Sequence, residues 1–433
     1  MKAYRLYAFR RSLTALAVIS LMLLLLATPI MGLAAGNPMK LVGALNPWKD
    51  GQFSNVSADA SRQVAYLGSF DDQGVAVIDT SDPTNPVLTE VLSTHITSDA
   101  DTSDSADLDL VGRYLAVSHQ PWSSDAAFTG ISVYDTQPDP YHPILLRRIT
   151  SAGVHTVQLD PEVESGRPYA YLNSEFDLKV TIVNILTGEI LSQYASPEGL
   201  GCLPSEDDCQ QFTFAHEGFI QRHPDSGRVL DYVSYWDSGL RLVDVTDPRQ
   251  PVEVGAFDYN PTQGTCCAHY AAATPSGDWV YLEDEIGIGG TGGVRILDTS
   301  ACDGTSYCTP VQTGTWHIQG HPVQAAAYHG RGNGSFHGVI QRFFTYDAHN
   351  LDLMGEDTLL VANYTMGVRL VDTTDKTDPV EVSFYLPNAN KNTACTQACF
   401  FQGRETWGAY FGSDGYIYAS DYWLGFFVID PPG

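Results

Sequence analysis

Basic residues are scarce in this sequence, and their scarcity argues against several classes of function. The 433 residues include 23 Lys and Arg against 51 Asp and Glu, which gives a formal net charge of -28. An acidic surface repels phosphate backbones, so the composition predicts no nucleic-acid partner. Disorder is not expected either, because 43% hydrophobic and 11% aromatic residues are ample for a packed core.

Known catalytic signatures and helical periodicity are also lacking. The chain contains no GxSxG, HExxH or P-loop sequence, so the common hydrolase and nucleotide-binding motifs give no lead. Its apolar runs are short and are not spaced like the faces of helices. The sequence therefore predicts an all-β protein whose activity no familiar motif reveals.

The first 36 residues differ from the rest of the chain. A basic start through Arg11, an apolar stretch from Leu13 to Met31 and small residues up to Gly36 are typical of a secretory signal peptide. The apolar stretch is also long enough for an uncleaved membrane anchor. Both interpretations predict a secreted, periplasmic or cell-surface protein, which contacts a membrane only through this segment if it is not cleaved.

Cysteine is infrequent, and its eight copies fall into four close pairs. An even number of cysteines in an exported chain predicts disulfides, with small local loops as the simplest connectivity. The adjacent pair forms either a strained vicinal bridge or bridges to other cysteines. A thiolate metal site is the alternative, although no CxxC spacing supports it. The pairs are Cys202/Cys209, Cys266/Cys267, Cys302/Cys308 and Cys395/Cys399.

One short pattern recurs seven times along the chain. Each copy is a β-branched run that begins with Gly in six of the seven and ends with Asp or Asn, which suits a buried strand and is too short for a helix. The copies are "GVAVID" ending at Asp79, "GISVYD" at Asp135, "KVTIVN" at Asn184, "GLRLVD" at Asp244, "GVRILD" at Asp298, "GVRLVD" at Asp372 and "GFFVID" at Asp430.

Each copy belongs to a larger unit of four antiparallel strands. A strand rich in Tyr precedes the run, a further strand precedes that one, and Asp-Pro turns such as Asp82-Pro83 and Asp247-Pro248 lead to a fourth strand. Seven such units without helices predict a seven-bladed β-propeller. The predicted blades of this single domain, 37–433, span about 54–92, 105–149, 153–194, 214–257, 267–315, 347–386 and 405–433 with 38–45.

The two ends of the predicted propeller complement each other. The unit that ends in "GFFVID" has no fourth strand after it, whereas "PMKLVGAL" near the N-terminus resembles the fourth strand "PVEVGAF" of another unit. An N-terminal strand that completes the last blade would close the ring and leave no open edge.

The sequence with these repeats resembles the LVIVD-repeat family of exported bacterial β-propellers. The Gly, the apolar run, the Asp and the Asp-Pro turn recur together in "LRLVD" and "VRLVD", and "HYAAATPSGDWVYLEDE" is similar to a segment of choice-of-anchor B proteins. The resemblance implies a propeller and an extracytoplasmic or surface location. It implies no activity, because the family is mostly without one.

Histidines recur at one register of the innermost strands. Aligning these strands on their apolar alternation gives a column in which the third to sixth blades each carry His at the channel mouth. Neutral imidazole is a favoured ligand of copper, iron and zinc, so the column predicts a metal site. The alternative is that the rings bond blade carbonyls or buried water. The column reads Ser54, Ala106, His155, His216, His269, His349 and Thr406.

Acidic residues near this column are candidates to orient the imidazoles. Glu217 is adjacent to His216, and Glu283, Asp284 and Glu285 lie on the strand that follows His269. A second acidic segment, residues 98–109, spaces its carboxylates like a calcium loop but lacks the turn glycine. Calcium is therefore a weaker expectation than a transition metal.

Two functions follow from these patterns. The first is an exported or cell-surface propeller that binds a protein or glycan partner through its loop-rich face. That face carries every cysteine pair except Cys302/Cys308 and the insertions at 195–213, 316–347 and 387–405. The second is a metal-dependent enzyme, oxidoreductase-like, with the four histidines as ligands.

Overall fold

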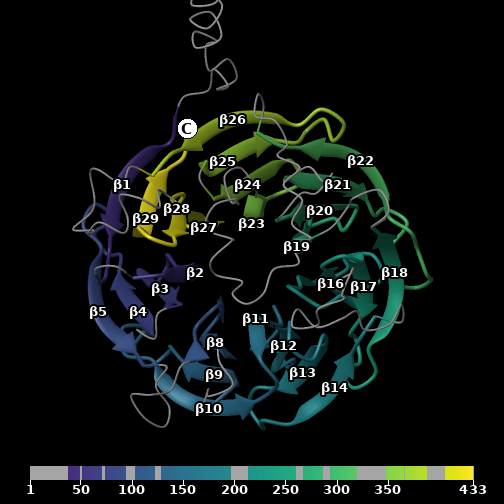
Figure 1. Cartoon of the computed structure of the whole chain (residues 1–433), viewed down its shortest axis with the longest axis horizontal. Coiled ribbons are helices and arrows are strands. Elements are labelled where there is room, and N and C mark those ends of the chain that lie inside the picture. The colour runs from purple at the N-terminus through teal and green to yellow at the C-terminus, as the bar shows by residue number, and fades with distance from the viewer. Residues whose placement is uncertain are drawn as a thin grey trace, which may run out of the picture.

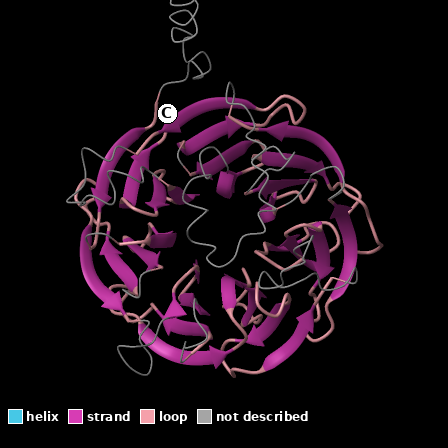
Figure 2. Cartoon of the chain, in the orientation of Figure 1, coloured by secondary structure: helices cyan, strands magenta, loops and turns pink. Residues whose placement is uncertain are grey.

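A computed structural model describes most of the chain from residue 38 onward. The described residues are 38–48, 51–70, 74–93, 103–121, 128–196, 213–259, 267–285, 293–318, 348–364, 366–387 and 405–432. Within these ranges the regular structure is strand and turn (Figure 2). None of the described residues forms a helix that is long and apolar enough to cross a membrane. The predicted signal peptide or anchor, residues 1–36, lies outside them.

Seven antiparallel sheets stand in a ring around a central axis (Figure 1). The seven-bladed β-propeller predicted from the sequence is therefore confirmed. The first blade contains β2 (Phe53–Asp59), β3 (Val64–Ser69), β4 (Val75–Asp79) and β5 (Val87–Leu92). The second contains β6 (Ser103–Asp104), β7 (Leu108–Val111), β8 (Tyr114–Pro121), β9 (Gly130–Asp135) and β10 (Ile144–Thr150), with β6 and β7 both paired to β8.

The third to fifth blades follow in chain order. The third contains β11 (Val154–Leu159), β12 (Tyr169–Ser174), β13 (Val180–Asn184) and β14 (Ile190–Tyr194). The fourth contains β15 (Ile220–Arg222), β16 (Val229–Tyr235), β17 (Gly239–Asp244) and β18 (Val252–Asp258). The fifth contains β19 (Ala268–Ala273), β20 (Trp279–Asp284), β21 (Val294–Asp298) and β22 (Val311–Trp316).

The last two blades complete the ring, and the N-terminal strand closes it. The sixth blade contains β23 (Ala348–Met354), β24 (Thr358–Asn363), β25 (Gly367–Asp372) and β26 (Val380–Tyr385). The seventh contains β27 (Thr406–Phe411), β28 (Ile417–Asp421), β29 (Gly425–Asp430) and, as its outer strand, β1 (Lys40–Leu45). In Figure 1 the purple β1 runs beside the yellow β29 at the rim, as the sequence predicts.

The recurring Gly and Asp of the repeat have local causes. Gly239 and Gly367, for example, have φ of 88° and 75°, and a Cβ there would lie 2.3 and 2.1 Å from the carbonyl oxygens of Phe257 and Tyr385 in the outer strand. Only glycine adopts a positive φ readily and has no Cβ to meet these oxygens. The Asp at the end of the run accepts a bond from the backbone N–H two residues on, as Asp244 does from Thr246 at 2.9 Å, and so fixes the turn to the outer strand.

Burial within a blade increases from the rim toward the third strand. Every residue of β17 is buried, whereas the outer strands alternate between exposed and covered positions. The hydrophobic clusters lie between neighbouring blades, for example between the sixth and seventh, where Leu360 and Leu370 pack with Phe427. Each blade is therefore held by its neighbours, and the first strands are placed around the axis.

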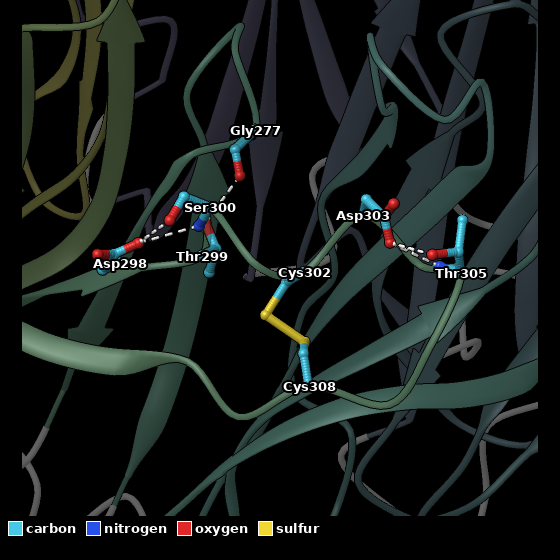
Figure 3. Close-up of a disulfide and its surroundings, with 8 residues drawn as sticks. All are labelled: Gly277, Asp298, Thr299, Ser300, Cys302, Asp303, Thr305 and Cys308. Carbon is cyan, nitrogen blue, oxygen red and sulfur yellow. Dashed lines mark hydrogen bonds between the residues drawn. A yellow bond between two sulfur atoms is a disulfide. The ribbon is translucent and has the colours of Figure 1, made fainter.

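The cysteine pair Cys302/Cys308 forms a disulfide, as predicted (Figure 3). It closes the turn between β21 and β22, and the Cys308 backbone exchanges hydrogen bonds with Val254 and Ala256 of the fourth blade, at 2.9 and 3.2 Å. The bridge therefore shapes a turn that ties the fifth blade to the rim of the fourth. Cys267 is also disulfide-bonded. Cys202, Cys209, Cys266, Cys395 and Cys399 lie outside the described residues, so their pairing stays a prediction.

Candidate functional site

The four histidines of the third to sixth blades lie together at the channel mouth. His155, His269 and His349 each follow the first residue of their inner strand, where the register shifts at a β-bulge. His216 lies before β15, next to Glu217, which forms an isolated bridge with Ser234. The ring centroids of neighbours are 4.6 Å apart for His155 and His216, 4.1 Å for His216 and His269, and 4.3 Å for His269 and His349. The predicted column thus forms a continuous arc of four imidazoles.

In the seventh blade, the residue at the column position differs from the one predicted. Thr406 pairs with Asp421 at the start of β27, just as Ala348 pairs with Asn363 at the start of β23. The residue equivalent to His349 is therefore Trp407, whose ring centroid lies 4.0 Å from that of His349. Alignment on apolar alternation does not detect the β-bulge, so it placed Thr406 in the column, one residue too early.

Each of the four imidazoles uses its Nδ1 in a hydrogen bond to an oxygen. His155 Nδ1 lies 2.8 Å from the Gln120 side-chain oxygen, and His216 Nδ1 lies 3.2 Å from the backbone oxygen of His269. The other two partners are Glu283 Oε2, 2.9 Å from His269 Nδ1, and the Trp407 backbone oxygen, 2.7 Å from His349 Nδ1. These acceptors place the proton on Nδ1, so each Nε2 carries a lone pair. Metal-binding histidines are commonly oriented in this way.

Two of these lone pairs face each other. His155 Nε2 and His216 Nε2 are 3.1 Å apart, and with both Nδ1 atoms protonated neither Nε2 has a hydrogen to donate. Two nitrogens bound to one metal ion at about 2.0–2.1 Å are about 2.9–3.4 Å apart, depending on the coordination angle. The observed separation fits a shared cation, which would turn a repulsive contact into an attractive one.

The histidines are kept neutral by their surroundings. Burial lowers the pKa of His155 to about 4 and that of His349 to about 3. The pKa values of His216 and His269 are also lowered well below the ordinary value, by burial and then by the neighbouring imidazoles. Neutral imidazole is the form that binds metal, so the arc is ready to act as a ligand set at neutral pH.

Carboxylates from the ends of second strands complete the arc. Glu175, just after β12, places Oε1 3.7 Å from His155 Nε2 and 4.0 Å from His216 Nε2. Glu285, just after β20, places Oε2 3.9 Å from His269 Nε2. Burial raises the pKa of each of these two carboxyl groups to about 7. Glu175 was not identified from the sequence.

The other predicted acidic partners divide between two faces of the strand. Glu283 accepts the His269 bond described above, and Glu217 has an oxygen within 4.8 Å of ligand atoms of His216 and His269. Asp284 instead pairs with Arg295, at 2.6 Å, and with Tyr259. Successive strand residues point to opposite faces, so Glu283 and Glu285 face the arc while Asp284 faces the interior of the blade.

The remaining three blades place different residues at the channel mouth. The first and second blades contribute Ser54 and Ala106, and the seventh contributes Trp407. Trp407 contacts Phe70 and Tyr422, with ring centroids 5.1 and 5.5 Å away, and all three rings are partly exposed. The mouth therefore has a histidine half and an aromatic half.

A small cavity lies between the two halves. It is partly open to solvent and is lined by the four histidines, by Asn55 and Ala106, and by Trp407. A ligand in this cavity would contact imidazoles on one side and an indole on the other.

The described part of the segment predicted as a weak calcium loop binds the neighbouring blade instead. Asp107 and Asp109 accept backbone N–H bonds from Val157 and Leu159 of the next blade, at 2.8 and 2.7 Å. These two carboxylates join inner strands. Residues 98–102 of the segment, and most of the insertions at 195–213, 316–347 and 387–405, lie outside the described residues.

Comparison with known proteins supports the repeat and the fold. The family model of the LVIVD repeat matches residues 64–94 and 231–259, in the first blade and the fourth, which confirms the resemblance seen in the sequence. No curated protein matches the chain.

Solved structures show the same architecture at low sequence identity. The C-terminal WD40 domain of Sif2 is 10% identical, with a TM-score of 0.55 over 92% of this chain and 99% of that one. The Cps50 (Swd1) β-propeller domain of Myceliophteria thermophila is 12% identical, with a TM-score of 0.54 over 90% and 99%. A functionally unknown protein from Desulfotomaculum acetoxidans DSM 771 is 12% identical, with a TM-score of 0.50 over 79% and 89%. At these identities the likeness concerns the fold alone.

Proposed function

We propose that this propeller is a metal-dependent enzyme whose centre is the histidine arc at the channel mouth. The observation that supports this best is the common orientation of the four imidazoles. Every Nδ1 is bonded to an oxygen, and every Nε2 is left as a lone pair at or near a neighbouring ligand atom. Four blades share this arrangement.

The ligand set favours copper, iron or zinc over calcium. Imidazole nitrogens suit these transition metals, whereas calcium takes oxygen ligands almost exclusively. Because copper and iron exchange electrons, an oxidoreductase is the reaction class that the donors favour. When bound, such an ion would supply a Lewis acid or a redox centre beside the cavity.

The rest of the cavity has the character of a substrate wall. Opposite the histidines, Ala106 is small and leaves room, while the partly exposed indole of Trp407 offers a flat apolar surface. Asn55 and Asp107 are tied to each other at 2.7 Å, which fixes the polar end of this wall. A substrate held against Trp407 would lie beside His349.

Metal analysis of the purified full chain tests the proposal. We expect at least one equivalent of copper, iron or zinc, and its loss in the double variant His216→Ala, His269→Ala. The matched control is His142→Ala, since His142 lies at the rim, is 65% exposed and touches only Glu90. A chain that folds, holds no metal and takes none up from solution would refute the proposal.

A second function is proposed from the aromatic half. We propose that the chain is exported or displayed at the cell surface and binds a protein or glycan partner on this face. The cluster of Phe70, Trp407 and Tyr422 supports it, because three partly exposed rings in contact form a surface on which sugar rings stack. Soluble hexasaccharides should quench Trp fluorescence in the native chain and not in Trp407→Ala. The absence of any quenching would argue against a glycan partner.

A further inference from the structure

We infer that the histidine arc holds two metal ions, each bound by two histidines and one glutamate. The inference rests on the proposal that the arc is a metal centre, and it specifies how many ions the centre holds and which residues hold them. One site is formed by His155, Glu175 and His216, and the other by His269, Glu285 and His349.

The two sites are copies of one unit of the propeller. In each, the first histidine and the glutamate come from the same blade, and the second histidine comes from the next blade. Glu175 follows Ser174, which pairs with Val154 beside His155. Glu285 follows Asp284, which pairs with Ala268 beside His269. The rotation that relates the third and fourth blades to the fifth and sixth therefore relates the two triads.

The ligand atoms of each triad lie close together, and those of the first triad are close enough to bind one ion. In the first, the three pairwise distances among His155 Nε2, His216 Nε2 and Glu175 Oε1 are 3.1, 3.7 and 4.0 Å. In the second, the ligand atoms of His269, Glu285 and His349 lie within 4.8 Å of one another, with His269 Nε2 and Glu285 Oε2 3.9 Å apart. Two imidazoles and one carboxylate form the facial triad common in iron enzymes, which leaves coordination positions open.

A single ion held by all four histidines fits the geometry less well. Two atoms bound to one ion at about 2.1 Å can be no more than about 4.2 Å apart. Among the described residues, no group of potential ligands within 4.8 Å of one another contains three of the histidines. Each group contains two, always from neighbouring blades. The arc is therefore too open for one ion and long enough for two.

The two triads adjoin each other, because His216, Glu217 and His269 form a third group of ligand atoms within 4.8 Å. The fourth and sixth blades differ from the blades that carry the two glutamates. The residue that follows the second strand is Trp236 in the fourth blade and Tyr364 in the sixth, where the third and fifth have glutamate. Trp236 stacks on His216 with centroids 5.1 Å apart, and Tyr364 packs edge-on against His349 at 5.0 Å. Carboxylate and aromatic residues thus alternate from blade to blade, and each aromatic supports the second histidine of a triad.

A further contact holds the second carboxylate in place. The Tyr364 hydroxyl donates to Glu285 Oε1 at 2.5 Å, which leaves Oε2 directed toward His269. Two ions on one wall would polarise a bound substrate from two points.

Titration of the metal-depleted full chain with Co²⁺ alone tests the number of sites. Bound Co²⁺ is followed by visible absorption and counted by elemental analysis after gel filtration. We expect two equivalents in the native chain and one in either Glu175→Gln or Glu285→Gln, with the affinity of the lost site reduced by at least about 100-fold. The matched control Glu189→Gln changes a carboxylate that is 49% exposed at the rim and should keep both equivalents.

The other outcomes separate this inference from the proposed function. One equivalent that survives both glutamate variants, and is lost in His216→Ala, His269→Ala, would overturn the two-ion inference and leave a single metal centre. No uptake by a folded native chain would refute the metal-dependent function together with the inference. Circular dichroism of each variant establishes that the propeller is folded.

Discussion

The two halves of the channel mouth share a backbone and differ in chemistry. The third to sixth blades place His155, His216, His269 and His349 at one register, whereas the other three place Ser54, Ala106 and Trp407 there. The inner strands of both halves have the same register shift after their first residues. The blade backbone therefore accommodates Ser, Trp and His alike at this position, so the backbone geometry alone does not require the histidines.

The halves also differ in what holds them together. The aromatic half contains the seam, where β1 completes the seventh blade and Met39 is buried among residues of the sixth and seventh blades. The histidine half contains buried polar groups and the Cys302–Cys308 bridge. We therefore expect changes at the seam to affect the fold most and changes in the arc to affect metal binding most.

The largest effect is expected at the seam. Deleting residues 38–45 exposes the edge of β29 and removes Met39 from the core, so we expect the melting temperature to fall by about 10 °C or more, measured by calorimetry. Met39→Ala should cost about 2–5 kcal/mol, and the exposed Lys40→Ala should change the stability by less than about 0.5 kcal/mol. A deletion that melts like the native chain would show that β1 does not close the ring.

A smaller effect is expected at the disulfide. Replacing Cys302 and Cys308 by Ala releases a loop with a sequence separation of 6, which should cost about 2 kcal/mol in denaturant unfolding. Metal content should not change, because the bridge lies at the rim and the arc at the axis. If metal is lost along with the bridge, metal binding at the axis depends on the stability of the rim.

A pH-dependent effect is expected from a buried acid of the histidine half. Burial raises the pKa of Asp231 from 3.8 to about 8, and its Oδ1 has no hydrogen-bond partner among the residues that the structure describes. The native state keeps a proton that the unfolded chain releases, so this residue lowers stability progressively as pH rises from about 4 to 8. Asp231→Asn should therefore stabilise the protein by about 1 kcal/mol or more at pH 8 and by little at pH 4.

The control for this effect is Asp225→Asn, because Asp225 is exposed. Melting temperatures of both variants and the native chain, taken between pH 4 and pH 8, give the comparison. A stabilisation by Asp231→Asn that does not grow with pH would mean that the carboxylate is ionised in the folded state.

The fold was predictable because its signals repeat. Seven copies of one run, six ending in Asp and one in Asn, and six with a leading Gly, indicate seven blades, and the similarity of "PMKLVGAL" to a fourth strand indicates the closure. The histidine register was predictable for the same reason. It was wrong in the seventh blade because side-chain alternation does not reveal a β-bulge, and Trp407 resembles a core residue.

Glu175 was not predicted because it lies in a turn, where no alternation applies. Its equivalence to Glu285 is visible only when the ends of β12 and β20 are aligned through their pairing with the inner strands. Asp284 was predicted, like Glu283 and Glu285, to orient the imidazoles. Adjacency in the sequence does not show which face of a strand a side chain occupies. Sequence repetition thus reveals residues that recur in every blade. The site is built from residues that occur in only some blades, so repetition does not reveal them.

The smallest effect on stability is expected from the arc itself. If the histidines are present for metal and not for packing, His155→Gln and His349→Gln in the metal-free protein should change the melting temperature by no more than a few degrees. Each glutamine keeps a polar atom near the original acceptor, at Gln120 for His155 and at the Trp407 carbonyl for His349. The same variants should remove the stabilisation that saturating Co²⁺ gives the native chain, which is about 2.7 kcal/mol at 100 times the dissociation constant. A large loss of stability in the metal-free protein would instead mean that the imidazoles hold the blades together. The two halves would then differ in how their blades pack and not in metal binding.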